Sequence, residues 1–199
     1  MTNGVLPVAK RAAQCAAFLL AVFFAGPAAA DSVAFIAKAG TFSISKDRQV
    51  IDGGSVIVDD GASGVFGLEL EWRQANGIAL GLEYVQYEND VSATGSSLRS
   101  TMDTSAILGN AKKYFRPMAT VNPYIGAGIG AATIDFNGNL ITGSAGGLAA
   151  QVMGGVELQS GKVGVYTELK YLYAEAEDDS NNKAKGTGTG AFAGIRILF

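Results

Sequence analysis

The sequence predicts an all-β protein, an eight-stranded antiparallel up-and-down barrel that spans a membrane after removal of a signal peptide. Apolar residues alternate with polar or charged residues through eight separate runs, as they do in strands with two unlike faces. No stretch after residue 30 reaches the roughly 18 consecutive apolar residues typical of a membrane-spanning helix. Short turns and longer polar segments also alternate between the runs, which is the pattern of a transmembrane barrel.

The first thirty residues have the composition of a secretory signal. Lys10 and Arg11 supply a positive start, residues 16–25 are apolar around FLLAVFF, and residues 28–30 are three alanines before Asp31. The apolar run is shorter than the roughly 20 residues that a membrane-spanning helix needs. We therefore predict that residues 1–30 are cleaved and that residues 31–199 form the barrel.

Composition excludes several classes of chemistry. The chain has no histidine, and its single cysteine, Cys15, lies within the predicted signal. A histidine-based triad, an imidazole metal site, a thiolate site and a disulfide framework are therefore excluded from the predicted mature chain. That chain carries 13 basic and 18 acidic residues, so it has no basic footprint for a nucleic acid. We expect no cofactor, no metal site and no nucleic-acid partner.

Four alternating runs lie in the first half of the barrel. In the second of them, Phe66, Leu68 and Leu70 fall on one face while Glu69 and Glu71 fall on the other. The remaining runs follow the same rule with shorter polar faces. The four runs are SVAFIAKAGTFSI (32–44), GVFGLELEWRQ (64–74), GIALGLEYVQY (77–87) and SAILGNAKKYF (105–115).

The second half of the chain repeats the pattern. The fifth run places Ile125 and Ile129 opposite a column of glycines, and the closing run places Ile195 and Ile197 opposite Arg196. Each face therefore continues one side of the sheet. The runs are NPYIGAGIGAATI (122–134), AGGLAAQVMGGVELQ (145–159), VGVYTELKYLY (163–173) and the segment from about residue 187 to 199.

The connections divide into two kinds. Short turns are predicted around Asn76-Gly77, at 116–122 and at 160–162, and the Asn-Gly pair is a strong hairpin signal. Longer polar segments at about 45–62, 89–101, 136–144 and 177–186 are predicted as loops. In transmembrane barrels the short turns face the periplasm and the long loops face outward.

The charged face must be the interior. Turned toward lipid, each Lys or Arg near the midplane would cost roughly 2–4 kcal/mol. Turned inward, five acids and five bases neutralise one another in a lumen that side chains nearly fill. The predicted lumenal charge network is Lys38, Glu69, Glu71, Arg73, Glu83, Lys112, Glu157, Glu168, Lys170 and Arg196. A soluble sandwich or barrel with an apolar core is the alternative.

Aromatic residues on the apolar face predict the edges of the membrane. Trp72, Tyr84, Phe115, Tyr171 and Tyr173 are the candidates for the aromatic girdle. The same face assignment predicts that Ile195→Arg impairs folding into bilayers more than Arg196→Leu does, provided water reaches the lumen.

Two segments carry a family resemblance. The closing run GAFAGIRILF resembles the signature with which outer-membrane barrels end, and ILGNAKKYFRPMATVNPYIGAGIGAA (107–132) resembles strands four and five of the small opacity-type barrels, whose family includes the transmembrane domain of outer membrane protein A. The resemblance implies a place in a bacterial outer membrane with its lipid and lipopolysaccharide. It also implies that barrel-assembly machinery reads Ile195, Ile197 and Phe199.

The resulting function is structural or surface-interactive. We expect a monomer whose four outer loops present adhesion or host-contact surfaces to a host or surface ligand, over a lumen filled by the charged network. A small low-conductance porin is the alternative. An enzyme is not expected, because barrel enzymes of similar size rely on histidine and this chain has none. Acidic loop segments at 59–60 and 175–179 leave divalent-cation binding open.

Overall fold

A computed structural model describes residues 32–44, 48–51, 54–58, 62–92, 99–117, 119–138, 143–177 and 183–199. The predicted signal at 1–30 lies outside these ranges, so its cleavage stays a prediction. Regular structure in the described ranges is entirely β-strand. Among these residues, no helix is long and apolar enough to cross a membrane.

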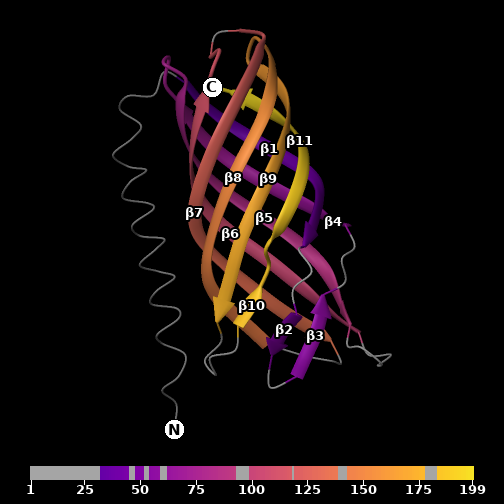
Figure 1. Ribbon diagram of the computed structural model, residues 1–199. Helices are drawn as coiled ribbons and strands as arrows, with labels where there is room; N and C mark the ends of the chain where they lie inside the picture. Colours follow the sequence, from indigo (N-terminus) through magenta and orange to yellow (C-terminus); the bar gives the residue numbers. More distant parts are fainter. Residues whose placement is uncertain are drawn as a thin grey trace.

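Eight long strands close into one antiparallel barrel (Figure 1). Each pairs with the next along the chain, and the last pairs with the first from Ala34↔Leu198 to Ile44↔Gly188. Closure leaves no unpaired edge among these strands. The prediction of an eight-stranded antiparallel barrel is confirmed. The strands are β1 (Ser32–Ile44), β4 (Ala62–Arg73), β5 (Ile78–Ser92), β6 (Arg99–Tyr114), β7 (Val121–Gly138), β8 (Gly143–Ser160), β9 (Val163–Glu177) and β11 (Gly188–Leu198).

Two of the predicted outer loops contain further strands. The segment 45–62 holds β2 (Arg48–Ile51) and β3 (Gly54–Val58), and the segment 177–186 holds β10 (Lys183–Lys185). These strands pair with one another and with β5 and β9, so they continue the wall past β1, β4 and β11. Figure 1 shows them together at the end of the barrel opposite the C terminus.

The other two predicted loops are also shorter than expected. β5 continues to Ser92 and β6 begins at Arg99, while β7 continues to Gly138 and β8 begins at Gly143. The outward face of these strand ends is polar, whereas the outward face of the same strands near the turns is apolar. Alternation of apolar residues therefore does not mark these ends as strands. We call this end of the barrel the loop-side half, and the end with the three short turns the turn-side half.

The turn between β4 and β5 forms as predicted. The Asn76 side chain accepts a hydrogen bond from the Ile78 amide at 2.8 Å, and Gly77 has φ of 82°. The Gly77 amide donates to the Gln74 carbonyl at 2.9 Å, and its carbonyl accepts from the Tyr114 amide at 2.8 Å. Positive φ explains why glycine occupies this position.

We expect Gly77→Ala to lower the free energy of unfolding by roughly 1–3 kcal/mol, because alanine is strained at this φ. A Cβ here would also meet the Tyr114 carbonyl oxygen. Urea titration of the barrel in lipid vesicles measures the loss. The control is Gly154→Ala on β8, where the nearest atom to a new Cβ is 3.7 Å away. Equal losses in both variants would contradict this account of the turn.

Candidate functional site

The turn-side half of the lumen contains a buried ion network. All ten residues predicted for it point inward, and each is at most 5% exposed. Lys38 lies at one centre, with its Nζ 2.7 Å from Glu83, 3.2 Å from Glu168 and 3.3 Å from Glu69. Lys170 Nζ joins the same group at 2.5 Å from Glu83. Side chains from β1, β4, β5 and β9 thus meet across the barrel.

A second centre lies around the two arginines. Arg196 Nη1 is 2.8 Å from Glu157 Oε1, and Arg196 Nη2 is 3.1 Å from Glu71. Arg73 Nη2 is 2.7 Å from Glu157. Lys112 connects the two centres, because its Nζ lies 2.8 Å from Glu69 and 3.1 Å from Glu71. Five acids and five bases therefore form one continuous network without net charge.

Neutral polar side chains complete this network. Asn110 and Gln151 donate to Glu83 at 2.8 and 2.7 Å, while Tyr114 donates to Glu71 and Tyr124 to Glu168, each at 2.9 Å. The alternation of the sequence places Asn110, Gln151 and Tyr124 on the interior face but gives them no role. Only the closed barrel brings them against the carboxylates, which lie on other strands.

Glycines make room for the largest interior side chains. A Cβ at Gly81 would meet the Glu69 carboxylate, and a Cβ at Gly128 would meet the Asn110 amide. The guanidinium of Arg73 also stacks 3.3 Å from the centre of the Tyr114 ring. Side chains therefore fill the lumen at this level, as the width of an eight-stranded barrel allows.

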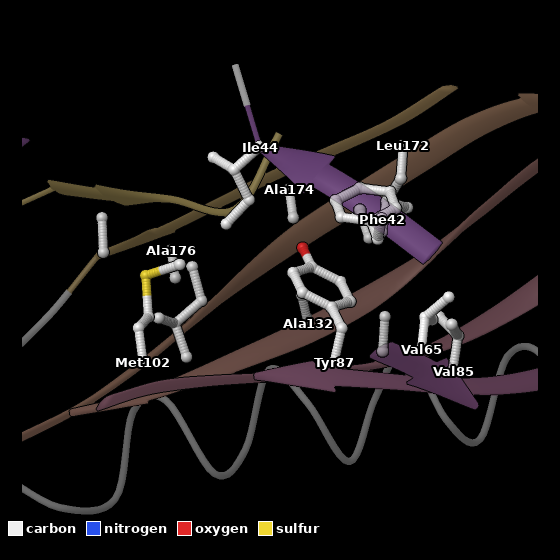
Figure 2. Close-up of a cluster of buried hydrophobic side chains, with 14 of the residues drawn as sticks. Phe42, Ile44, Val65, Val85, Tyr87, Met102, Ala132, Leu172, Ala174 and Ala176 are labelled. Atoms are coloured by element: carbon white, nitrogen blue, oxygen red, sulfur yellow. The ribbon is translucent and has the colours of Figure 1, made fainter. Parts of the chain in front are cut away.

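The loop-side half of the lumen is mainly apolar, with Asn89, Ser100 and Thr104 buried among its apolar side chains, which corrects the prediction of a lumen filled by charge. Phe42 and Tyr87 stack with ring centres 4.3 Å apart, and Figure 2 shows both directed toward the barrel axis with Met102 and Leu172. Tyr87 also donates a hydrogen bond across the lumen to the Gly186 carbonyl. The cluster comprises Phe42, Ile44, Val65, Val85, Tyr87, Met102, Ala106, Leu108, Ala132, Ile134, Phe136, Ala145, Ala149, Leu172, Ala174, Ala176, Ala184 and Phe192.

At the level where the interior changes from charged to apolar, the exterior changes from apolar to polar. On β7 the outward side chains are Ile125 and Ile129 near the turns, then Thr133, Asp135 and Asn137 toward the loops. The neighbouring strands change in the same way. Outward polar residues of the loop-side half include Gln86, Glu88 and Asp90 on β5, Thr101, Asp103 and Ser105 on β6, and Glu175 and Glu177 on β9.

The barrel therefore inverts along its axis. The turn-side half is apolar outside and charged inside, as a barrel surrounded by lipid must be. The loop-side half is polar outside and apolar inside, as a barrel surrounded by water is. The change between the two marks the outer edge of the lipid-facing band.

Tyrosines of the predicted girdle lie at this edge. Tyr84 donates to Gln86 at 2.9 Å and Tyr173 donates to Glu175 at 2.7 Å, so each ring faces the apolar band while its hydroxyl reaches the polar residues beyond. Tyr171 is 45% exposed on the same side. Trp72 and Phe115 lie near the turns, and Phe115 is exposed. Their contact with lipid headgroups stays a prediction.

The closing strand presents its apolar residues outward. Ile195, Ile197 and Phe199 are exposed, and the Phe199 amide donates to the Val33 carbonyl at 2.9 Å. The terminal side chain thus lies at the turn-side rim of the apolar band. Recognition by assembly machinery stays a prediction.

No protein family matches the sequence, and no curated protein matches it. Solved structures do share the fold. Neisserial surface protein A is 20% identical over 84% of this chain and 97% of its own, with a TM-score of 0.58. OprG of Pseudomonas aeruginosa is 15% identical over 85% and 97%, with a TM-score of 0.60.

A third similar structure is Ail, the attachment invasion locus protein of Yersinia pestis, solved in complex with the heparin analogue sucrose octasulfate. It is 13% identical over 84% of this chain and 99% of its own, with a TM-score of 0.50. The chain has the fold of the small outer-membrane β-barrels. Together with the apolar exterior of the turn-side half, this fold places the barrel in a bacterial outer membrane.

The interior carboxylates are paired with bases. Within the described ranges, no group of three or more His, Cys, Asp or Glu side chains is arranged to hold a metal ion. Each of the five interior glutamates lies in an ion pair with at least one base. The five acids and five bases are therefore paired with one another in a formally neutral network.

Burial of Arg196 changes the expected ranking of two substitutions. Arg196 is 1% exposed, so no water replaces the cation in Arg196→Leu, and breaking a buried ion pair costs roughly 3–5 kcal/mol. Ile195→Arg exposes a cation to lipid at about 2–4 kcal/mol. We expect Arg196→Leu to lower the free energy of unfolding in vesicles at least as much as Ile195→Arg does, with Ile195→Leu as the control.

The network also predicts a rescue. Adding Glu157→Gln to Arg196→Leu restores equal numbers of acids and bases, so the double variant should recover roughly 0.5–3 kcal/mol relative to the sum of the single losses. Strictly additive losses would contradict the coupling.

The inversion predicts three different effects of lysine on β7. Ile129→Lys faces lipid and should cost about 2–4 kcal/mol. Asp135→Lys faces water and should change stability by about 0.5 kcal/mol or less. Ile134→Lys enters the apolar cluster and should cost several kcal/mol. Urea titration in vesicles compares the three, and a penalty at 135 as large as at 129 would contradict the assigned edge.

Proposed function

We propose that this protein is a non-conducting outer-membrane barrel that holds its outer loops above the membrane for contact with a surface or host ligand. The observation that carries the proposal is the inversion of the loop-side half. Its apolar cluster and polar exterior support a folded extension into water, so the loops begin on a rigid wall rather than at the lipid surface. The chain is expected to act as a monomer. It is also expected to act without catalysis, since the sequence has no histidine and the interior glutamates are paired.

The charge of this extension favours a ligand that is not polyanionic. Its outward residues include six carboxylates: Glu88, Asp90, Asp103, Asp135, Glu175 and Glu177. Glu88, Asp103 and Asp135 are successive cross-strand partners on β5, β6 and β7. Complementary potentials govern recognition by charged surfaces. We therefore expect binding that differs from the sulfated-sugar complex of Ail.

Binding by the folded protein in nanodiscs tests this role. We expect no measurable binding to immobilised heparin and measurable, salt-sensitive binding to polylysine or to basic regions of host matrix proteins, measured by surface plasmon resonance. The triple variant Glu88→Gln, Asp90→Asn, Asp103→Asn should weaken the polylysine signal at least threefold. Ile125→Leu within the lipid band is the matched control. Heparin binding by the wild type would contradict the proposed ligand chemistry.

A small low-conductance porin is the second candidate, because interior charges can line a water path. The filling of the lumen by two layers of buried side chains argues against it, since side chains then occupy the space that a water path would need. We expect planar-bilayer recordings of the pure protein to show no steady channel. Stable single-channel steps that scale with salt would favour the porin.

A further inference from the structure

The exterior wall has a hollow at the outer edge of the lipid-facing band. It spans β4, β1, β11, β9 and β8 and has a volume of about 530 Å³. The strand register places its outward-facing lining residues in two neighbouring cross-strand rows. The first row consists of Ala62, Ser43, Thr189, Tyr171 and Val152. The second row consists of Thr41, Ala191, Leu169 and Gly154, and Gly64 on β4 is the cross-strand partner of Thr41.

The hollow exists because three adjacent strands lack large outward side chains. β4, β1 and β11 contribute only alanine, glycine, serine and threonine to the two rows. Leu169, 70% exposed, and Tyr171, 45% exposed, form a raised bank on β9. Phe66, 48% exposed, rises from β4 on the turn side. A groove with an alkyl-lined bank thus lies in a wall that lipid surrounds.

The groove is amphipathic in the direction of the barrel axis. Ser43 and Thr189 are cross-strand partners and place hydroxyl groups at its loop-side end. Ala191 and Leu169 are cross-strand partners on its turn side, within the apolar band. An occupant therefore has an alkyl part directed toward the bilayer centre and an oxygen-bearing part at the membrane surface.

We propose that this groove holds one acyl chain of lipopolysaccharide. The groove lies at the outer edge of the lipid-facing band and therefore in the outer leaflet, whose lipid is lipopolysaccharide, and the inference rests on that membrane placement. A flexible chain follows a concave surface and gains dispersion contacts along it, whereas the convex wall of a second barrel leaves the hollow unfilled. The hydroxyls of Ser43 and Thr189 meet the ester and hydroxyl oxygens at the head of the chain.

Filling the groove tests the proposal. Ala191→Phe places a ring in the hollow, and Ala111→Phe places the same ring on the outward face of β6, which β7 separates from the groove. Each variant and the wild type are extracted from outer membranes in mild detergent and weighed by native mass spectrometry. Heat-modifiable migration in gels first establishes that all three are folded. We expect wild type and Ala111→Phe to retain one lipopolysaccharide, and Ala191→Phe to retain at least fivefold less.

Four results would overturn the proposal. They are equal retention by Ala191→Phe and wild type, no retained lipid in the wild type, phospholipid in place of lipopolysaccharide, and a wild-type dimer that Ala191→Phe converts to a monomer. If Ala191→Phe does not fold, Thr41→Leu fills the same hollow and the same readout applies. Because retention is independent of conductance and of loop-ligand binding, failure here leaves the proposed function standing.

Discussion

The ion network inside the turn-side half is the interaction on which the rest of the barrel depends. Ten charged side chains in an enclosed lumen are stable only if every charge meets its opposite, because an unpaired buried ion costs several kcal/mol. Lys38 on β1 contacts carboxylates of β4, β5 and β9, and Lys112 on β6 contacts two carboxylates of β4, so the network ties distant parts of the wall together. With charge held inside, the outer face of the same strands is free to be wholly apolar.

The surrounding medium explains the second half of the molecule. A strand has only two faces, and the face in contact with lipid must be apolar while the face in contact with water is polar. Where the exterior of β7 changes from Ile129 to Thr133, its interior changes from glycine to Ile134. The loop-side half thereby gains an apolar core, whereas the interior of outer-membrane barrels is ordinarily polar.

The two halves resist water for different reasons. In the turn-side half, charges and hydrogen-bonding groups already satisfy one another, and in the loop-side half apolar side chains surround the buried polar residues Asn89 and Thr104. Tyr87 donates a hydrogen bond across the lumen there, to the Gly186 carbonyl. Such a lumen suits a rigid support for loops better than a path for solutes. The polar exterior of the same half, rich in carboxylates, is then the surface that meets a partner.

The sequence by itself determined the strands of the membrane half, their faces and the tight turn at Asn76-Gly77. Period-two alternation and turn chemistry are local features of the sequence, and contact with lipid makes the alternation strong. It also placed all ten charged residues on the interior face. Tertiary structure decided which charges pair, because Arg196 and Glu157 meet only when β11 and β8 close the barrel with β9 between them. It also decided that β2, β3 and β10 extend the wall and that an apolar cluster fills the outer lumen, since a polar outer face and short, interrupted strands remove the apolar signal on which local reasoning depends.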